Sequence, residues 1–445
     1  MDCILQNFIS KAGDCNVIDP ELYKTYNVKK GLRNEDGTGV LVGLTKLADV
    51  VGYKTVDGHK VDDKGRLFYR GIDIRDIINN KEEGRADLFE EGAFLILFGY
   101  LPTANELKEF KDYLSSQYSL PQNFLEHNIL ALPGENLLNK LQQTMLMLYN
   151  FDEDPDNTSP EAILEKGLCI IAKIPSIVCY IYQSKMNYYN NHDLVIKHPV
   201  KDLTIAENII YMLDSDPCCQ KEFAELLDLM LFIHADHGGG NNSTFINSVA
   251  TSTLTDLYSA ITGGMGAMKG PRHGAANIAV SRMMQAVKNE IGITRDKDKI
   301  RAIIYRLLNK DFFDKKGLIY GIGHAVYTLS DPRSEFLQEK CRELAEKRGF
   351  LEELEFYNTF AEIAIEVMKE TKGINVCSNL DFYSGFAYRM MGIPEELYTL
   401  LFITARIVGW VAHNMEFNAY CDKIIRPATL YVGKRQNYVP RKDRV

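Results

Sequence analysis

Four of the nine histidines lie in the stretches HADHGGGNNS, KGPRHGAAN and YGIGHAVYTLSDPR, which are rich in glycine or turn residues. They are His234, His237, His273 and His324. A histidine in such a stretch lies on a loop or at a helix end, where proteins often present catalytic side chains. Its imidazole can take up or give a proton near neutral pH. Taken singly, a histidine of this kind is more often structural than catalytic.

Two other kinds of chemistry fit these residues less well. His234 and His237 are three positions apart and would share one face of a helix, as metal ligands can. No H-E-x-x-H or C-x-x-C pattern accompanies them, so the sequence predicts no metal site. The segment GGMGAMKG follows no predicted strand and matches neither nucleotide-binding glycine pattern, so we discard it as a phosphate loop.

Two later segments carry single charged residues with the same ambiguity. Asp381 lies in SNLDFYSGFAYRMMG, and Arg426 lies in KIIRPATLYVG. A lone aspartate in a turn is usually a helix cap or turn former. A lone arginine before proline is usually a surface residue. Neither segment indicates a function by itself.

The combination and order of these segments, however, resemble the citrate synthase family. The family pattern has H-x-D-H, G-P-x-H-G-x-x-N and G-x-G-H-x-V-x-x-x-x-D-P-R, followed by N-x-D-x-x-S-G, an arginine before V-G-W-x-A-H, and R-P. Here the matches are His234–His237, Gly270–Asn277, Gly321–Arg333, Asn379–Gly385, Arg406–His413 and Arg426–Pro427. They span residues 231–433, and YRGIDIRDI (Tyr69–Ile77) extends the resemblance toward the N-terminus. Six motifs in one order over half of the chain are a specific signal.

The resemblance implies a Claisen-type condensation of acetyl-CoA with oxaloacetate to citryl-CoA, followed by hydrolysis to citrate and CoA. This chemistry needs a base for the methyl group, a donor for the enol oxygen and a donor for the ketone. By resemblance, Asp381 is the base, His273 stabilises the enol, and His324 acts on the oxaloacetate carbonyl. No cofactor is implied, because acetyl-CoA is itself a substrate.

The resemblance also implies how the substrates are bound. Oxaloacetate is a dianion, and guanidinium groups match carboxylates with two parallel hydrogen bonds. The residues implied for oxaloacetate are His237, Arg333, Arg406 and Arg426. In the family the last arginine reaches the site of the neighbouring subunit, which implies a homodimer or a multiple of dimers.

Recognition of CoA is less clearly marked. The positions that match CoA-binding residues of the family are Gly321, Gly323 and Asn379. At Thr328, many family members carry a basic residue near the CoA phosphates. Lys269 and Arg272, or the basic tail KRQNYVPRKDRV, are the alternatives for this contact, and the tail is also compatible with a solvated chain end.

Two rival functions follow from the same residues. A 2-methylcitrate synthase has the same fold and prefers propionyl-CoA, and one methylene is worth only about 1–3 kcal/mol of discrimination. No position reveals this preference. A non-catalytic helical scaffold is the rival of another class, although every acid–base and arginine position of the family pattern is filled.

Helices must position these residues. Residues 38–73 combine short apolar runs with Asp-Gly turn signals and predict a small β-hairpin region. Helical periodicity dominates afterwards, with Thr103 predicted as a helix N-cap and Pro394 at the start of an apolar helix. The small residues of segment 243–268 predict a close helix–helix contact, either within one subunit or between subunits. The fold class is therefore mainly α.

The resemblance further implies two helical domains. The large domain comprises residues 1–274 and 381–445, and the small domain comprises residues 275–380. Catalysis of two incompatible steps in one pocket suggests that the two domains close on the substrates.

Composition excludes other classes of protein. The 445 residues carry 51 Lys and Arg against 60 Asp and Glu, a net charge of −9 that argues against nucleic acid or an anionic membrane as partner. The nine scattered cysteines form no disulfide framework, and the apolar runs are too short to span a bilayer. We therefore expect a cytoplasmic protein.

Overall fold

The computed structural model describes residues 5–6, 9, 17–34, 38–57, 59–82, 84–213, 217–270, 273–274, 276–420 and 423–444. The chain divides into two compact units, Met1–Leu44 and Thr45–Val445. In the first unit the described elements are α2 (Glu21–Thr25), the 3-10 turn η1 (Lys30–Leu32) and an isolated bridge between Arg33 and Gly39. All of the predicted site residues belong to the second unit.

The second unit begins with an antiparallel sheet of three strands in the order β1, β2, β3. The strands are β1 (Ala48–Val56), β2 (His59–Tyr69) and β3 (Ile72–Asp73). Ala48 pairs with Tyr69 at one end of the β1–β2 register. The predicted hairpin region is confirmed, and its strands begin ten residues after position 38.

The remaining described elements are helices. The α-helices that follow are α3 (Ile74–Asn79), α4 (Leu88–Phe98), α5 (Ala104–Ser116), α6 (Leu137–Leu148), α7 (Pro160–Asn190), α8 (Ile205–Met212), α9 (Gln220–His234), α10 (Asn242–Thr251), α11 (Leu257–Lys269), α12 (Ala276–Ile291), α13 (Lys297–Leu308), α14 (Pro332–Arg348), α15 (Leu351–Lys372), α16 (Leu380–Met390) and α17 (Tyr398–Tyr420). The short turns are η2 (Leu125–Leu130), which is π-helical, and the 3-10 turns η3 (Tyr149–Phe151), η4 (Pro217–Cys219), η5 (Glu395–Leu397) and η6 (Arg441–Asp443). The mainly α fold class is confirmed.

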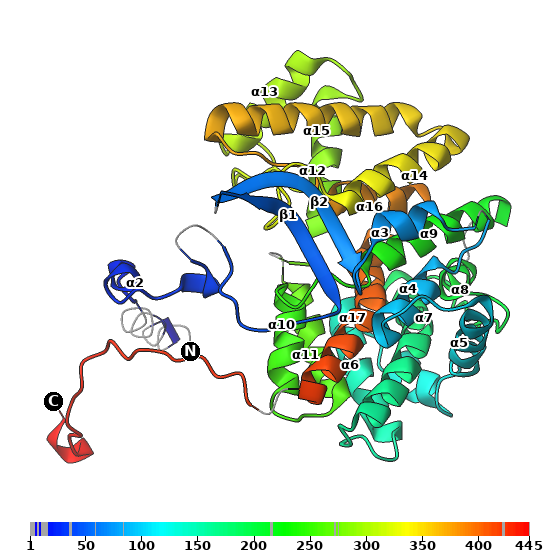
Figure 1. Ribbon diagram of the computed structural model, residues 1–445, viewed down its shortest axis with the longest axis horizontal. Coiled ribbons are helices and arrows are strands. Elements are labelled where there is room, and N and C mark those ends of the chain that lie inside the picture. Colours follow the sequence, from blue (N-terminus) through cyan, green and yellow to red (C-terminus); the bar gives the residue numbers. More distant parts are fainter. Residues whose placement is uncertain are drawn as a thin grey trace. The chain divides into compact units, whose positions relative to one another are not determined.

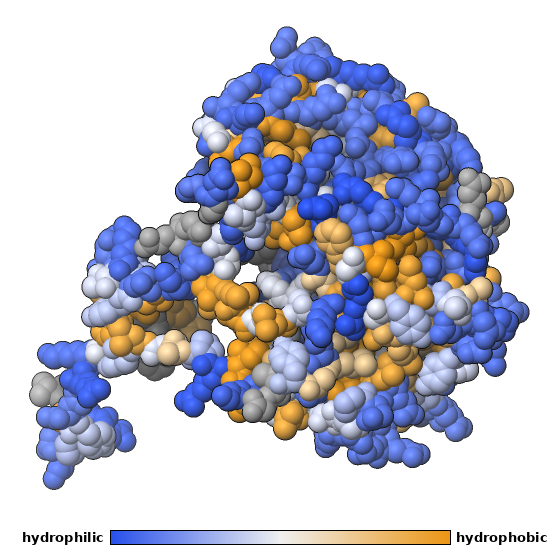
Figure 2. Space-filling view, viewed as in Figure 1, coloured by the Kyte–Doolittle hydropathy of each residue, from blue (hydrophilic) through white to orange (hydrophobic). Residues whose placement is uncertain are grey.

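Helix α17 is the central element of this unit. Its residues from Tyr398 to Asn414 are all buried, because α17 packs against α4, α7, α9, α10 and α11. Helices α12 to α16 pack on one another and gather in the upper part of Figure 1, where charged and polar residues cover most of the face seen in Figure 2. Contacts of α14 with α9, and of α12 with α17, join this group to the helices around α17.

Local sequence signals set several helix ends as predicted. Thr103 accepts a hydrogen bond from the Glu106 N–H and forms a capping box at the start of α5. Pro394 precedes η5 and α17. Segment 243–268 forms α10 and α11, which pack on each other and on α17. The proposed boundary between a large and a small domain stays a prediction, and its residue Ala275 lies outside the described residues.

Hydropathy along the described helices gives one further finding. None of them combines the length and the apolar character that a transmembrane span requires.

Candidate functional site

The imidazole of His324 is held in one protonation form by the backbone of its own loop. Its Nδ1 accepts hydrogen bonds from the N–H groups of Val326 at 3.0 Å and Tyr327 at 3.1 Å. A nitrogen that accepts two N–H bonds carries no proton, so the proton of the neutral ring lies on Nε2. Burial lowers the pKa of His324 to about 4, with Arg333 acting in the same direction. At neutral pH His324 is therefore an uncharged side chain with one N–H donor on Nε2.

The glycine loop before His324 is joined to the start of α16. The Gly323 N–H donates to the Cys377 carbonyl at 2.8 Å, and Asn379 Nδ2 donates back to the Gly323 carbonyl at 2.8 Å. The Asn379 N–H donates to the Gly321 carbonyl at 2.9 Å. Both glycines have positive φ, +79° and +101°, which explains the G-x-G spacing. The three residues predicted for CoA, Gly321, Gly323 and Asn379, thus form one structural unit.

Asn379 also positions Asp381. Its side-chain oxygen caps α16 by accepting the Asp381 N–H at 3.0 Å, which places the carboxyl group in the first turn of the helix. Burial raises the pKa of Asp381 to about 6, although Arg333 and Arg406 lower it. A carboxylate in such an environment is a stronger base than one in water, because its neutral form is favoured.

Arg333 forms a buried ion pair at the start of α14. Its Nε and Nη2 donate to the two carboxylate oxygens of Asp331 at 3.0 and 2.8 Å, and its guanidinium lies 5.5 Å from the Tyr327 ring centre. Asp331 also accepts the Leu380 N–H at 3.3 Å. The pair therefore connects α14 with α16 and with the ring that stacks on His324 at 4.7 Å.

The H-x-D-H segment lies where α9 ends against α17. His234 is buried, and its Nδ1 donates to the Met230 carbonyl at 2.5 Å, while its own carbonyl accepts from Arg406 Nε at 2.8 Å. The His237 ring lies 5.2 Å from the His324 ring. Burial lowers the pKa of His237 well below its usual value, with Arg333 acting in the same direction, and its buried Nε2 has no hydrogen-bond partner among the described residues. A buried polar atom without a partner is costly and often marks a ligand position.

His273 lies in the turn after α11. Its N–H donates to the Gly270 carbonyl at 2.9 Å, and its Nε2 lies 3.0 Å from the hydroxyl oxygen of Ser243. Burial lowers the pKa of His273 to about 4, and the charge of Arg406 lowers it further. His273 is therefore neutral at pH 7, and its Nδ1 is not part of the Ser243 contact.

Two arginines connect these groups electrostatically. Arg406 affects the pKa of Asp381, His237 and His273, and Arg333 affects those of Asp381, His237 and His324. Residues from five separate parts of the sequence thus influence one another around the two guanidinium groups. The predicted residues that the structure brings together are His237, His273, His324, Arg333, Asp381 and Arg406.

The remaining predicted residues lie elsewhere or cannot be placed. Arg426 is exposed on the segment after α17, where the neighbouring Ile425 N–H donates to Ser252. Arg426 is therefore not one of the buried groups that this chain assembles by itself. Lys269 donates to Asn139, and Arg272 lies outside the described residues. The described residues of the basic tail, 434–444, are exposed.

Sequence reasoning gave no role to several residues that hold this site. They are Asp331, Tyr327, Ser243, Asp236 and His413. Asp331 carried a usable signal, because Asp before Pro is a common start of a helix. Asp236 and His413 are fixed letters of the motifs H-x-D-H and V-G-W-x-A-H, which could have marked them. Tyr327 and Ser243 carried no signal, since their partners are far away in the sequence.

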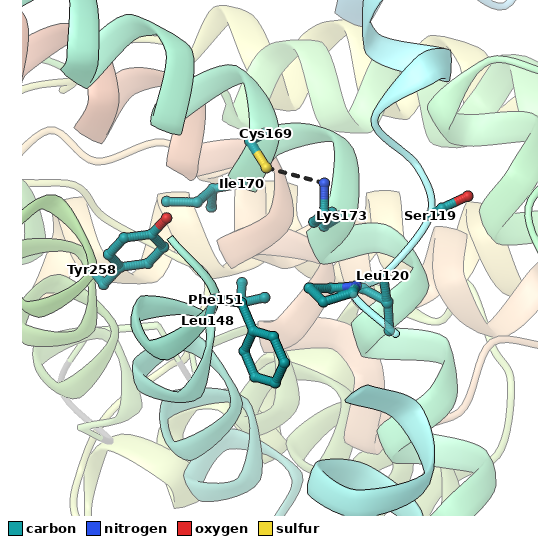
Figure 3. Close-up of a pocket in the computed structure, with 9 residues that line it drawn as sticks. Ser119, Leu120, Leu148, Phe151, Cys169, Ile170, Lys173 and Tyr258 are labelled. Atoms are coloured by element: carbon teal, nitrogen blue, oxygen red, sulfur yellow. Dashed lines mark hydrogen bonds between the residues drawn. The ribbon is translucent and has the colours of Figure 1, made fainter. Parts of the chain in front are cut away.

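A separate cavity of about 280 Å³ lies between α7, α11 and the segment 119–121 (Figure 3). Lys173 points into it and donates to Cys169 Sγ at 3.0 Å and to the Gln117 carbonyl at 2.9 Å. None of the predicted site residues lines this cavity, so it is not part of the site described above.

Comparison with known proteins agrees with the fold and identifies the family. The family model "Citrate synthase, C-terminal domain" matches residues 37–428. The citrate synthase of Haloferax volcanii is 34% identical over 423 residues, which cover 94% of this chain and 99% of that protein. The 2-methylcitrate synthase of Shewanella oneidensis is 32% identical over 368 residues, covering 82% of this chain and 88% of that protein.

A solved structure is similar over nearly the whole chain. The citrate synthase of Thermoplasma acidophilum, solved as a ternary complex with carboxymethyl coenzyme A and oxaloacetate, has a TM-score of 0.75 at 26% identity. The match covers 94% of this chain and 99% of the Thermoplasma chain. These matches define an acyl-transferring condensing enzyme. The chain belongs to the citrate synthase family.

Proposed function

We propose that this enzyme condenses acetyl-CoA with oxaloacetate and hydrolyses the citryl-CoA intermediate to citrate and CoA. The observation that carries the proposal is the pairing of a carboxylate of raised pKa, Asp381, with two neutral imidazoles around two buried arginines. The ternary complex of the Thermoplasma relative with oxaloacetate and a CoA analogue supports this choice of substrates.

In the proposed first step, Asp381 removes a proton from the methyl group of acetyl-CoA. The negative charge moves onto the thioester oxygen, where His273 donates a hydrogen bond. Because Nε2 of His273 faces Ser243, the donor to the substrate is Nδ1–H. This form of the ring requires the Ser243 hydroxyl, which donates to Asn241 Oδ1 at 3.0 Å, to rotate and donate to His273 Nε2 instead.

In the second step, the methylene carbon attacks the ketone carbon of oxaloacetate. His324 is suited to this step, because its Nε2–H is the one proton that the ring can donate. It polarises the ketone and then transfers that proton to the new alkoxide, giving the hydroxyl group of citryl-CoA. Water then cleaves the thioester, and the thiol of CoA leaves. Proton transfers of this kind need no cofactor, and we propose none.

We propose that Arg333, Arg406 and His237 bind the carboxylates of oxaloacetate. Arg406 uses only Nε in its bond to the His234 carbonyl, so both Nη groups remain outside that bond. Gly321, Gly323 and Asn379 bond mainly to one another, so we propose that they shape the CoA-binding loop rather than hold phosphate.

We propose a homodimer in which Arg426 completes the site of the neighbouring subunit. Its exposure on the C-terminal segment supports this arrangement. Apolar side chains are also exposed around α6 and α10, namely Leu146, Met147, Ile246 and Leu254, and a subunit contact would cover them. We further propose that the enzyme acts in the cytoplasm and supplies citrate to the tricarboxylic acid cycle.

The test is thiol release from acetyl-CoA, measured with and without oxaloacetate in the presence of a strong chelator. We expect release that depends on oxaloacetate and is unaffected by the chelator. Thiol release without oxaloacetate, or none with it, would contradict the proposal.

The second candidate is a 2-methylcitrate synthase, which the similarity to the Shewanella enzyme supports. Its substrate differs by one methylene, so the two activities are expected to differ by kcat/KM rather than by presence or absence. Steady-state measurement with acetyl-CoA and propionyl-CoA side by side decides between them.

A further inference from the structure

Three residues of α17 form a stripe that faces the H-x-D-H segment. Arg406, Gly409 and His413 are spaced by three and four positions, which places them on one face of the helix. Each of them contacts a successive residue of the opposite segment. Arg406 Nε donates to the His234 carbonyl at 2.8 Å, and the Gly409 N–H donates to the Ala235 carbonyl at 3.2 Å.

The third contact of the stripe is a buried acid–base pair. His413 Nε2 lies 3.2 Å from Asp236 Oδ2, and both side chains are at most 5% exposed. Gly409 allows this approach, because a Cβ there would lie 2.6 Å from both the Ala235 carbonyl oxygen and Asp236 Oδ1. Asp236 Oδ2 also accepts the Gly238 N–H at 3.3 Å. The carboxylate thus links α17, through His413, to the backbone that directly follows His237.

Charge gives Asp236 a second connection to the site. Burial raises the pKa of Asp236, but His413 and Arg406 lower it further than burial raises it, so the carboxyl is ionised. Asp236 is in turn the strongest influence that opposes the effect of burial on the pKa of Arg406. Its Oδ1 is buried and has no hydrogen-bond partner among the described residues. Because Asp236 is buried, its negative charge is stabilised by the His413 contact more than the charge of a surface carboxylate would be by a similar contact.

We propose that Asp236 and His413 are a positioning pair for oxaloacetate binding. The pair holds the His237 turn and the Arg406 guanidinium in the arrangement that receives the substrate carboxylates, and it leaves the acetyl-CoA side of the site unaffected. The inference rests on the proposed function, because it concerns one substrate of that reaction.

The test compares variants of His413 in the full-length enzyme. His413→Leu removes the partner of Asp236, and we expect the KM for oxaloacetate to rise about tenfold or more, as for loss of one hydrogen bond to a buried charged group. His413→Gln keeps an N–H donor of similar reach and is expected to restore most of the affinity. The KM for acetyl-CoA is expected to stay near that of the wild type in both variants.

Asp236→Asn separates positioning from simple electrostatics. Removal of an anion beside Arg406 would, by charge alone, strengthen the binding of a dianion and lower the KM for oxaloacetate. Loss of the anchor raises it instead, which is the result we expect. This variant is nearly isosteric, so it also gives a reading if His413→Leu fails to fold.

Thr251→Val is the matched control. Thr251 accepts a hydrogen bond from Asn414, the neighbour of His413 on α17, at 2.7 Å, and both are buried. This variant breaks a buried hydrogen bond of α17 outside the stripe, so it should lower Tm without changing the KM for oxaloacetate.

The outcomes are distinguishable from failure of the proposed function. A wild type without oxaloacetate-dependent thiol release contradicts that function. If the wild type is active, three results would contradict the positioning pair. The His413 and Asp236 variants could match Thr251→Val, they could lose affinity for both substrates equally, or they could bind oxaloacetate more tightly.

Discussion

Two buried arginines face the same region of the molecule, but the chain balances their charges differently. Arg333 forms two parallel hydrogen bonds with Asp331, which raises its pKa above the usual range although burial opposes this. Arg406 donates from Nε to a backbone carbonyl and forms no ion pair with a carboxylate of the described residues. Burial lowers its pKa to about 10.

The difference assigns distinct tasks to the two guanidinium groups. A guanidinium already paired in a fork has much of its charge balanced, and it contributes to the position of the elements that it joins. A guanidinium without a directly paired carboxylate, such as Arg406, is compensated only by charges that it does not contact, Asp236 first among them, and its Nη groups can receive an anion. We infer that Arg406 is the main receptor for a carboxylate of oxaloacetate, and that Arg333 also maintains the connection between α14 and α16.

The largest expected effect comes from a variant that leaves both arginines in place. Asp381→Asn removes the base and nearly preserves shape, so turnover should fall about a thousandfold, within the range attributed to general bases. The KM for oxaloacetate should change little, because the residues that bind it remain. Steady-state kinetics with Tm as a control for folding provides the measurement. A variant with turnover within about tenfold of the wild type would remove Asp381 from its proposed role.

Paired substitutions test the two arginines directly. Arg406→Gln and Arg333→Ala should each raise the KM for oxaloacetate about a hundredfold or more, with a much smaller effect on that for acetyl-CoA. Only Arg333→Ala should also lower stability strongly, by about 3–5 kcal/mol, because it leaves Asp331 buried without its partner. Urea unfolding of both variants measures this difference. If both variants lose the same stability, the charges of Arg333 and Arg406 are compensated to the same extent.

The pH dependence of turnover gives a smaller but more specific effect. The pKa of Asp381 is raised to about 6, so the base form is present above that pH and turnover should fall as pH drops through it. His273 and His324, with pKa values of about 4, remain neutral over the same range. Arg333 lowers the pKa of Asp381 more than Arg406 does, and Asp331 raises it.

Loss of Arg333 should therefore move the midpoint to higher pH further than loss of Arg406. The kcat–pH profiles of Arg333→Ala and Arg406→Gln at saturating substrate check this order. An equal shift, or a larger shift in the Arg406 variant, would contradict it.

The smallest expected effect concerns the backbone that supports Arg406. Gly409→Ala places a methyl group 2.6 Å from the Ala235 carbonyl oxygen, so the helix must move, at a cost of about 1–3 kcal/mol. Gly263→Ala on α11 is the control, because its new Cβ would meet Ile246 at an ordinary 3.4 Å. Thermal unfolding should show a lower Tm for the first variant only. A Gly409 variant as stable as the control would mean that the contact can relax.

Much of the helical framework could be predicted from local signals. The capping box at Thr103, the hairpin region before residue 73 and the apolar helix after Pro394 all depend on neighbours within a few positions. The ordered motifs also need no knowledge of the contacts, and they indicate the family by themselves. The histidines, Asp381 and Arg406 were found through these motifs and not through any property of the single residues.

The protonation states and the pairing of charges, in contrast, depend on residues that are distant in the sequence. The bond between Arg406 and the His234 carbonyl joins positions 172 residues apart, and that between His413 and Asp236 joins positions 177 apart. Which residues become buried, and which buried charges find a partner, is decided when the helices pack. Since desolvation and partner geometry set a pKa, no local pattern can supply it.

By itself, the sequence determined which side chains are available, the helices that carry them and the family to which their order belongs. The tertiary structure alone decided that His324 donates from Nε2, that Arg333 is paired while Arg406 is not, and that Asp381 lies in an environment that raises its pKa. The physical reason is that helix formation and capping are short-range, whereas burial and charge compensation arise only when distant segments exclude water between them.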